Sequence, residues 1–124
     1  MSDAAEEWIR SWSDSVSERA AAAREMSDRV ARLRVDATDT DRLVTATVNG
    51  SGSLVDLRLS PDAARLRMDG LAELILRTMR RAQAGLADRV AAIAAQTVGS
   101  DSESARAVVS SFESRYPEVR DDDA

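Results

Sequence analysis

The chain has 124 residues, a formal net charge of −5, and arginine as its only basic residue type. Its length suits one domain with tails, and with only 3% aromatic residues, a core built largely from Ala and Val removes little apolar area from water per side chain. Without Cys or His the chain lacks thiolate ligands, the usual metal ligand and the usual proton shuttle, so we expect no enzyme activity, no metal or other cofactor and no small-molecule substrate.

The N-terminal segment from Met1 to Glu7 is acidic and lacks the positively charged and apolar parts of a secretory signal. No later run approaches the roughly 18 apolar residues that cross a membrane. We therefore expect a cytoplasmic protein without membrane contacts.

The segment from about residue 4 to 34 contains neither Gly nor Pro, and its apolar residues recur in steps of three and four, which predicts a helix with a heptad stripe. The stripe comprises Ile9, Trp12, Val16, Ala23, Met26, Val30 and Leu33, with Arg19 in the one polar position. At 1.5 Å per residue this helix would be about 45 Å long, so part of it projects from a small domain and needs a second helix to cover its stripe. We therefore predict a homodimer with coiled-coil character, with candidate dimer or partner contacts at Trp8, Ile9, Trp12 and Val16. Packing within one monomer is the alternative, although no other segment is long enough to cover the stripe.

Two alternating segments, Leu43 to Val48 and Leu54 to Leu59, predict a half-buried β-hairpin. Its apolar face carries Val44, Ala46 and Val48 with Val55, Leu57 and Leu59, and its other face is polar. The connection Asn49-Gly50-Ser51-Gly52 suits the positive φ values of a tight turn. Residues 33–38 would add a short edge strand before the hairpin.

A second long helix is predicted from Asp69 to about Thr97, with Gly99 as its stop. Its apolar residues fall three or four apart and should cover the apolar face of the hairpin. Gly85 lies inside this helix at a cost of about 1 kcal/mol relative to Ala, so either close packing compensates or the helix bends. Residues 1–99 thus form one α+β domain, and residues 100–124 an acidic, largely flexible tail with one short helix from about Ala107 to Phe112.

The hairpin region resembles that of the YbaB/EbfC nucleoid-associated proteins of bacteria. The resemblance rests on Leu43-Val44-Thr45-Ala46-Thr47-Val48-Asn49-Gly50-Ser51-Gly52, on Leu54-Val55-Asp56-Leu57-Arg58-Leu59-Ser60-Pro61, and on the acidic-Leu pattern of Asp69 to Leu74. It covers roughly residues 30–98, and Arg42 stands where the family often has Gly. It implies an α-β-β-β-α order, a tweezer-like homodimer with projecting long helices, and binding to nucleoid DNA with little sequence dependence.

Any DNA site must be local on this acidic chain, and residues 43–99 are net positive, with seven arginines against five acids. Candidate phosphate contacts are Arg24, Arg29, Arg32 and Arg34 toward the end of the first helix and Arg77, Arg80 and Arg81 on the second. The alternative is that these arginines pair with acids four residues away, as Glu25 with Arg29, Asp28 with Arg32 and Glu73 with Arg77.

Two functions compete on this basis. The first is a nucleoid-associated DNA-binding homodimer. The second is a protein-interaction module without DNA affinity, such as a cytoplasmic accessory factor of a type VII secretion system, whose components YbaB-like proteins can resemble. The acidic surface and the pair of Trp8 and Trp12 on one helix face favour this second function. For an enzyme, the carboxylates on helix faces and loops have neither a nucleophile nor a metal partner.

Overall fold

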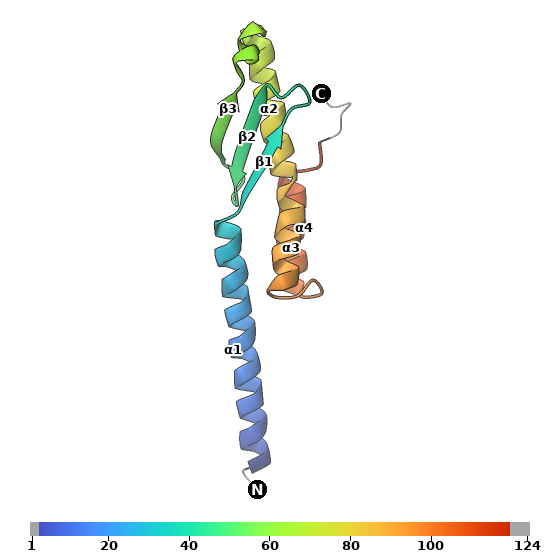
Figure 1. Cartoon of the computed structure of the whole chain (residues 1–124). Coiled ribbons are helices and arrows are strands. Elements are labelled where there is room, and N and C mark those ends of the chain that lie inside the picture. Colours follow the sequence, from blue (N-terminus) through green and yellow to red (C-terminus); the bar gives the residue numbers. More distant parts are fainter. Residues whose placement is uncertain (1–2, 120–124) are drawn as a thin grey trace.

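A computed structural model describes residues 3–119 of the chain and has an α+β fold. The elements in order are α1 (Asp3–Ala31), β1 (Arg34–Thr38), β2 (Val44–Asn49), β3 (Leu54–Leu59), the 3-10 helix η1 (Pro61–Arg65), α2 (Met68–Ala84), α3 (Leu86–Gln96) and α4 (Glu103–Arg115). Figure 1 shows α1 running away from the sheet, while α2 and α3 follow one another along one side of the molecule. The predicted α+β class is therefore confirmed.

The three strands form one antiparallel sheet in the order β1-β2-β3. The edge strand predicted at residues 33–38 is confirmed as β1, and the predicted hairpin as β2 and β3. The pairing of β2 with β3 shifts between Thr47 and Val48, so that Val48 lies opposite Leu54. This irregularity leaves Val55 without a partner in the register, so the strict alternation predicted for the hairpin is interrupted at the beginning of β3.

The apolar face of the hairpin is covered only on β2. Val44, Ala46 and Val48 are fully buried, and α2 contacts both β1 and β2. Every residue of β3 is exposed, including its apolar residues at 36–47%. The expectation that the second helix would cover the whole hairpin is therefore wrong. A helix about 10–12 Å across spans roughly two strands spaced about 4.8 Å apart, and β3 lies beyond its reach.

The predicted second helix divides at Gly85 into α2 and α3. Close packing accompanies this break, because a Cβ at Gly85 would lie 3.1 Å from Val35 Cγ1 on β1. Both outcomes considered for Gly85 thus occur together. Gly99 has a φ of 90° just beyond α3, which suits its predicted role in ending that helix.

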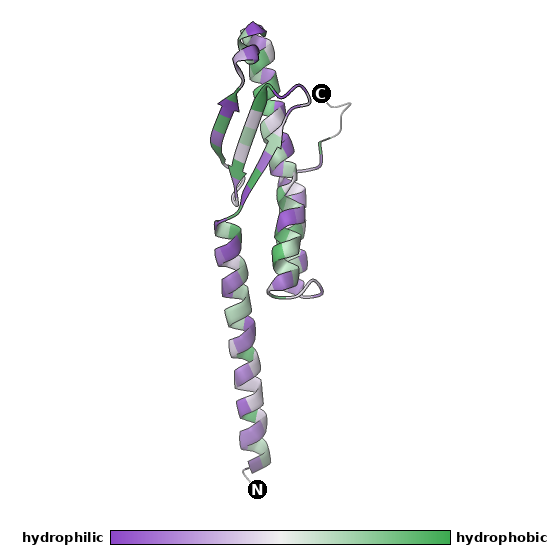
Figure 2. Ribbon diagram, in the orientation of Figure 1, coloured by the Kyte–Doolittle hydropathy of each residue, from purple (hydrophilic) through white to green (hydrophobic). Residues whose placement is uncertain are grey.

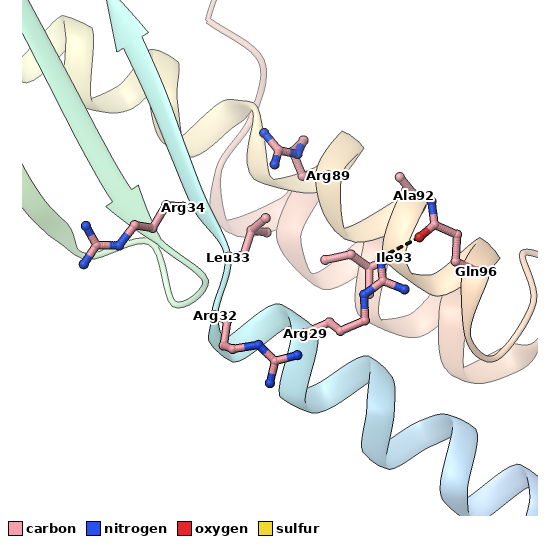
Figure 3. A pocket seen from close by; sticks show the side chains of 8 residues that line it. All are labelled: Arg29, Arg32, Leu33, Arg34, Arg89, Ala92, Ile93 and Gln96. Atoms are coloured by element: carbon pink, nitrogen blue, oxygen red, sulfur yellow. Dashed lines mark hydrogen bonds between the residues drawn. The ribbon is translucent and has the colours of Figure 1, made fainter.

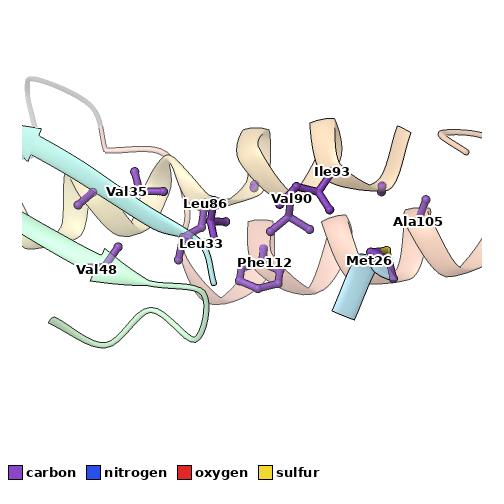
Figure 4. Close-up of a cluster of buried hydrophobic side chains, with 12 residues drawn as sticks. Met26, Leu33, Val35, Val48, Leu86, Val90, Ile93, Ala105 and Phe112 are labelled. Atoms are coloured by element: carbon purple, nitrogen blue, oxygen red, sulfur yellow. The ribbon is translucent and has the colours of Figure 1, made fainter. Parts of the chain in front are cut away.

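The core joins the end of α1, strands β1 and β2, and helices α2, α3 and α4 (Figure 4). Leu86 and Val90 are fully buried at its centre, and Phe112 of α4 packs there as well. The short helix predicted around Ala107 to Phe112 is present as α4. The domain boundary at residue 99 stays a prediction, and residues 120–124 of the predicted tail lie outside the described residues.

The segment after α4 reaches back to the hairpin turn. Tyr116 Oη donates a hydrogen bond to the Ser51 carbonyl oxygen at 2.8 Å, and Gln83 Nε2 donates to the Gly52 carbonyl oxygen at 2.8 Å. Gly52 has a φ of 84°, and a Cβ there would collide with the Tyr116 ring. The turn glycine thus provides both the left-handed backbone and the room that Tyr116 needs.

Candidate nucleic-acid interface

Four arginines from three parts of the chain line one cleft of about 420 Å³ at the junction of α1, β1 and α3. Figure 3 shows this arginine cleft, which is lined by Arg29, Arg32, Leu33, Arg34, Arg89, Ala92, Ile93 and Gln96. No carboxylate is among these lining residues. The cleft is therefore a concentrated positive site on a chain whose net charge is negative.

Local folding explains why these arginines line one cleft. At the end of α1, Leu33 N–H donates to the Val30 carbonyl oxygen at 3.1 Å, and the chain then turns into β1. Leu33 and Val35 are buried, whereas Arg32 and Arg34 alternate with them and are exposed. Because strand side chains alternate between faces, the two buried residues anchor the segment and leave both guanidinium groups toward solvent.

Packing of α3 against α1 completes the cleft. Ile93 of α3 is buried in the core, one helical turn after the exposed Arg89. Arg29 of α1 donates a hydrogen bond to the side-chain oxygen of Gln96, which joins the two helices directly (Figure 3). Residues four apart on a helix share a face, so burial of Ile93 places Arg89 beside the end of α1.

The ion pairs considered from the sequence do not form. Within residues 3–119, no carboxylate oxygen lies within 4.0 Å of the guanidinium groups of Arg29, Arg32 or Arg77. The same holds, over this span, for Arg34 and Arg89. Among the described residues these cations therefore have no carboxylate partner, which leaves their charge available for an external anion.

The arginines predicted on the second helix are divided between two hollows. Arg77 and Arg80 line a cleft of about 370 Å³ together with Arg115, and Glu118 lies at the same cleft. Arg81 instead faces a neighbouring hollow whose lining includes Asp88, Glu113 and Glu118. The carboxylates reduce the positive charge of both hollows, so the arginine cleft between α1 and α3 is the stronger anion site.

Two residues change the predicted set at the arginine cleft. Arg24 is exposed on α1 and lies outside the lining of the cleft. Arg89 belongs to it but was not a candidate from the sequence. Its only signal in the sequence is that it lies four residues before Ile93. This spacing predicts a place in the cleft only once α3 is known to pack on α1.

Two apolar surfaces are exposed as well. The first, which we call the tip stripe, consists of Trp8, Ile9, Trp12 and Val16 on the N-terminal half of α1, exposed by 42–68%. The second, which we call the edge patch, combines residues of β3 with one residue just after η1 and two residues of α2. Its residues are Leu54, Val55, Leu57, Leu59, Leu66, Met68 and Leu76. Exposed clusters of this kind mark protein contacts more often than isolated apolar residues do.

Two kinds of site are absent from the described part of the chain, residues 3–119. That part of the chain contains no group of three or more Asp, Glu, His or Cys residues suited to a metal ion. None of its helices is long and apolar enough to span a bilayer.

The model of the YbaB/EbfC DNA-binding family matches residues 9–101. The matched span contains most of α1, the whole sheet, α2 and α3, and ends before α4. All four arginines of the cleft fall within it. No curated protein matches the sequence.

Proposed function

The chain belongs to the YbaB/EbfC DNA-binding family, and on this premise we propose that it binds duplex DNA as a homodimer, through phosphates and with little sequence specificity. The family consists of nucleoid-associated DNA-binding proteins and is not known for enzymes. The proposed location is accordingly the cytoplasmic nucleoid. The alternative of an interaction module without DNA affinity gains no support from the family match.

The arginine cleft is the observation that carries this proposal. Arginine presents a planar fork of donors to phosphate oxygens, and each phosphate that it neutralises releases condensed counterions. Four such groups belong to residues that line one cleft, and none has a carboxylate partner within 4.0 Å among the described residues. Phosphate contacts position a protein on DNA but carry no sequence information, which accounts for the proposed low specificity.

The edge patch supports a homodimer. Strand β3 is a sheet edge with one side of its backbone unpaired, and its apolar side chains are exposed. An exposed apolar edge invites pairing with another chain, and a two-fold axis would bring the same patch of each copy together. Such a dimer covers the part of the hairpin that α2 does not reach, and it doubles the number of arginine clefts.

A salt-titrated gel shift combined with a mass measurement tests this function. The expected result is retardation of unrelated duplexes at 50 mM salt, with affinity lost steeply by 200 mM. Light scattering should give the mass of two or more chains. Unchanged DNA mobility at low salt, with intact protein, would refute the DNA-binding proposal, while a monomer at every concentration would refute the dimer.

A further inference from the structure

The tip stripe continues a seam whose other half is already buried in the body of the protein. On α1, Met26 is buried in the core and Val30 packs against it, and Leu33 follows just after the helix. Ile9, Trp12 and Val16 occupy the same heptad positions nearer the N-terminus, yet they are exposed. Figure 2 shows α1 extending well beyond the other elements, with apolar positions along its free half.

The residues beside the tip stripe carry no charge. With Ile9 and Trp12 at the seam positions a and d, the flanking e and g positions between residues 8 and 22 follow from the heptad. Apart from Trp8, which belongs to the tip stripe itself, these are the small residues Ser13, Ser15, Ala20 and Ala22. Charges at e and g set partner choice in coiled coils, and like charges there would repel a second copy. Small uncharged flanks instead allow two identical helices to approach closely.

The charge along α1 selects the direction of pairing. Residues 3–19 carry five carboxylates and two arginines, whereas residues 20–34 carry two carboxylates and four arginines. Parallel pairing would bring two acidic tips together and place Arg19 opposite its own copy. Antiparallel pairing instead brings the acidic tip of each copy to the level of Arg24 of the other, which is favourable.

We propose that the tip stripe docks antiparallel on the tip stripe of a second copy of this chain, with Trp12 of each copy packing on Val16 of the other. Together with the edge patch, this second self-interface links dimers to one another. Because each dimer carries its own arginine clefts, linked dimers hold two DNA duplexes together. This consequence for DNA rests on the proposed function, whereas the contact between copies does not.

Two substitutions one residue apart test the contact. Val16→Glu places a carboxylate on the seam, whereas the matched control Ser17→Glu places it on the outer face of α1. Both sites are exposed, so folding should be retained and is checked by circular dichroism. We expect Val16→Glu to halve the mass measured by sedimentation at micromolar concentration, with no change for Ser17→Glu. Equal masses for the wild type and both variants would overturn the proposal and leave the stripe for a different partner.

The direction of pairing has its own test, because the chain contains no cysteine. Ser15 lies at position g, which faces g of the partner in an antiparallel pair and e in a parallel pair. A short bis-maleimide should therefore join two copies of Ser15→Cys, and should not join copies of Ser17→Cys on the outer face. Absence of the Ser15→Cys product, with both thiols labelled by a single maleimide, would overturn the antiparallel arrangement.

A bead assay tests whether the protein links two DNA duplexes. One duplex is fixed to beads, and the amount of a second, free duplex that the protein captures on them is measured. We expect Val16→Glu to keep the gel-shift salt slope of the wild type while capturing several-fold less of the second duplex. Full capture by Val16→Glu would overturn the role of the stripe in bridging. Loss of gel shift in the wild type would instead refute the proposed function and leave the sedimentation test standing.

Discussion

Neutralising Arg89 should reduce the dependence of DNA affinity on salt in a measurable way. Its guanidinium lines the arginine cleft, and no carboxylate among residues 3–119 lies within 4.0 Å of it. If each Arg89 neutralises one phosphate, a dimer loses two contacts on Arg89→Gln, which lowers the slope of log affinity against log salt by about 1.8. At 0.1 M salt this corresponds to an affinity about 60-fold weaker.

The assay is a gel shift or fluorescence anisotropy titration at several salt concentrations between 50 and 200 mM. Arg106→Gln is the matched control, because it removes the same charge from an exposed position on α4 that lies outside the arginine cleft. Its slope should equal that of the wild type. Equal slopes for Arg89→Gln and Arg106→Gln would refute the assignment of the cleft as the phosphate site. The loss on Arg89→Gln should also be similar for unrelated duplexes, since phosphate contacts do not read bases.

Three further predictions concern stability and assembly. The buried Asp39 carboxylate accepts hydrogen bonds from the N–H groups of Leu43 and Val44 at 2.7 Å and from that of Asp41 at 3.1 Å. Asp39→Ala removes these bonds and should lower the free energy of unfolding in urea by about 2–3 kcal/mol. A loss below 0.5 kcal/mol would contradict this reading of the loop. Leu57→Asp places a charge in the edge patch and, combined with Val16→Glu so that the tip stripe no longer links copies, should give a folded monomer in light scattering. A mass equal to that of Val16→Glu alone would show that the copies of the dimer meet elsewhere. Arg42 has a φ of 59°, so Arg42→Val should destabilise by about 1–2 kcal/mol, whereas Arg42→Gly should stay within about 1 kcal/mol of the wild type in thermal unfolding.

The edge patch illustrates where sequence reasoning ends. Alternation along Leu54 to Leu59 identified a strand with an apolar face, and that strand is present as β3. The pattern could not show that α2 covers β1 and β2 while β3 stays exposed. Which part of an apolar face is buried depends on where a helix distant in sequence packs. The alternation within one strand does not determine the position of that helix.

The arginine cleft follows the same division. Arg29, Arg32 and Arg34 were candidates because they lie close together along the chain, and the structure does bring them to one cleft. Arg89 joins them from a helix more than fifty residues later, and Arg24 falls outside. Nearness in sequence identifies neighbours on one element, but only the packing of α3 on α1 decides which charges share a site.

By itself the sequence determined the local elements of this protein. The long Gly- and Pro-free helix, the hairpin with its Asn-Gly-Ser-Gly turn and the apolar periodicity of the second helical segment all arise from interactions between near neighbours, which the order of residues records directly. Only the tertiary structure decided that β3 remains uncovered, that the helix divides where Gly85 meets Val35, and that Arg89 completes the cleft. These features depend on contacts between residues far apart in the chain, whose distances are set when the core packs.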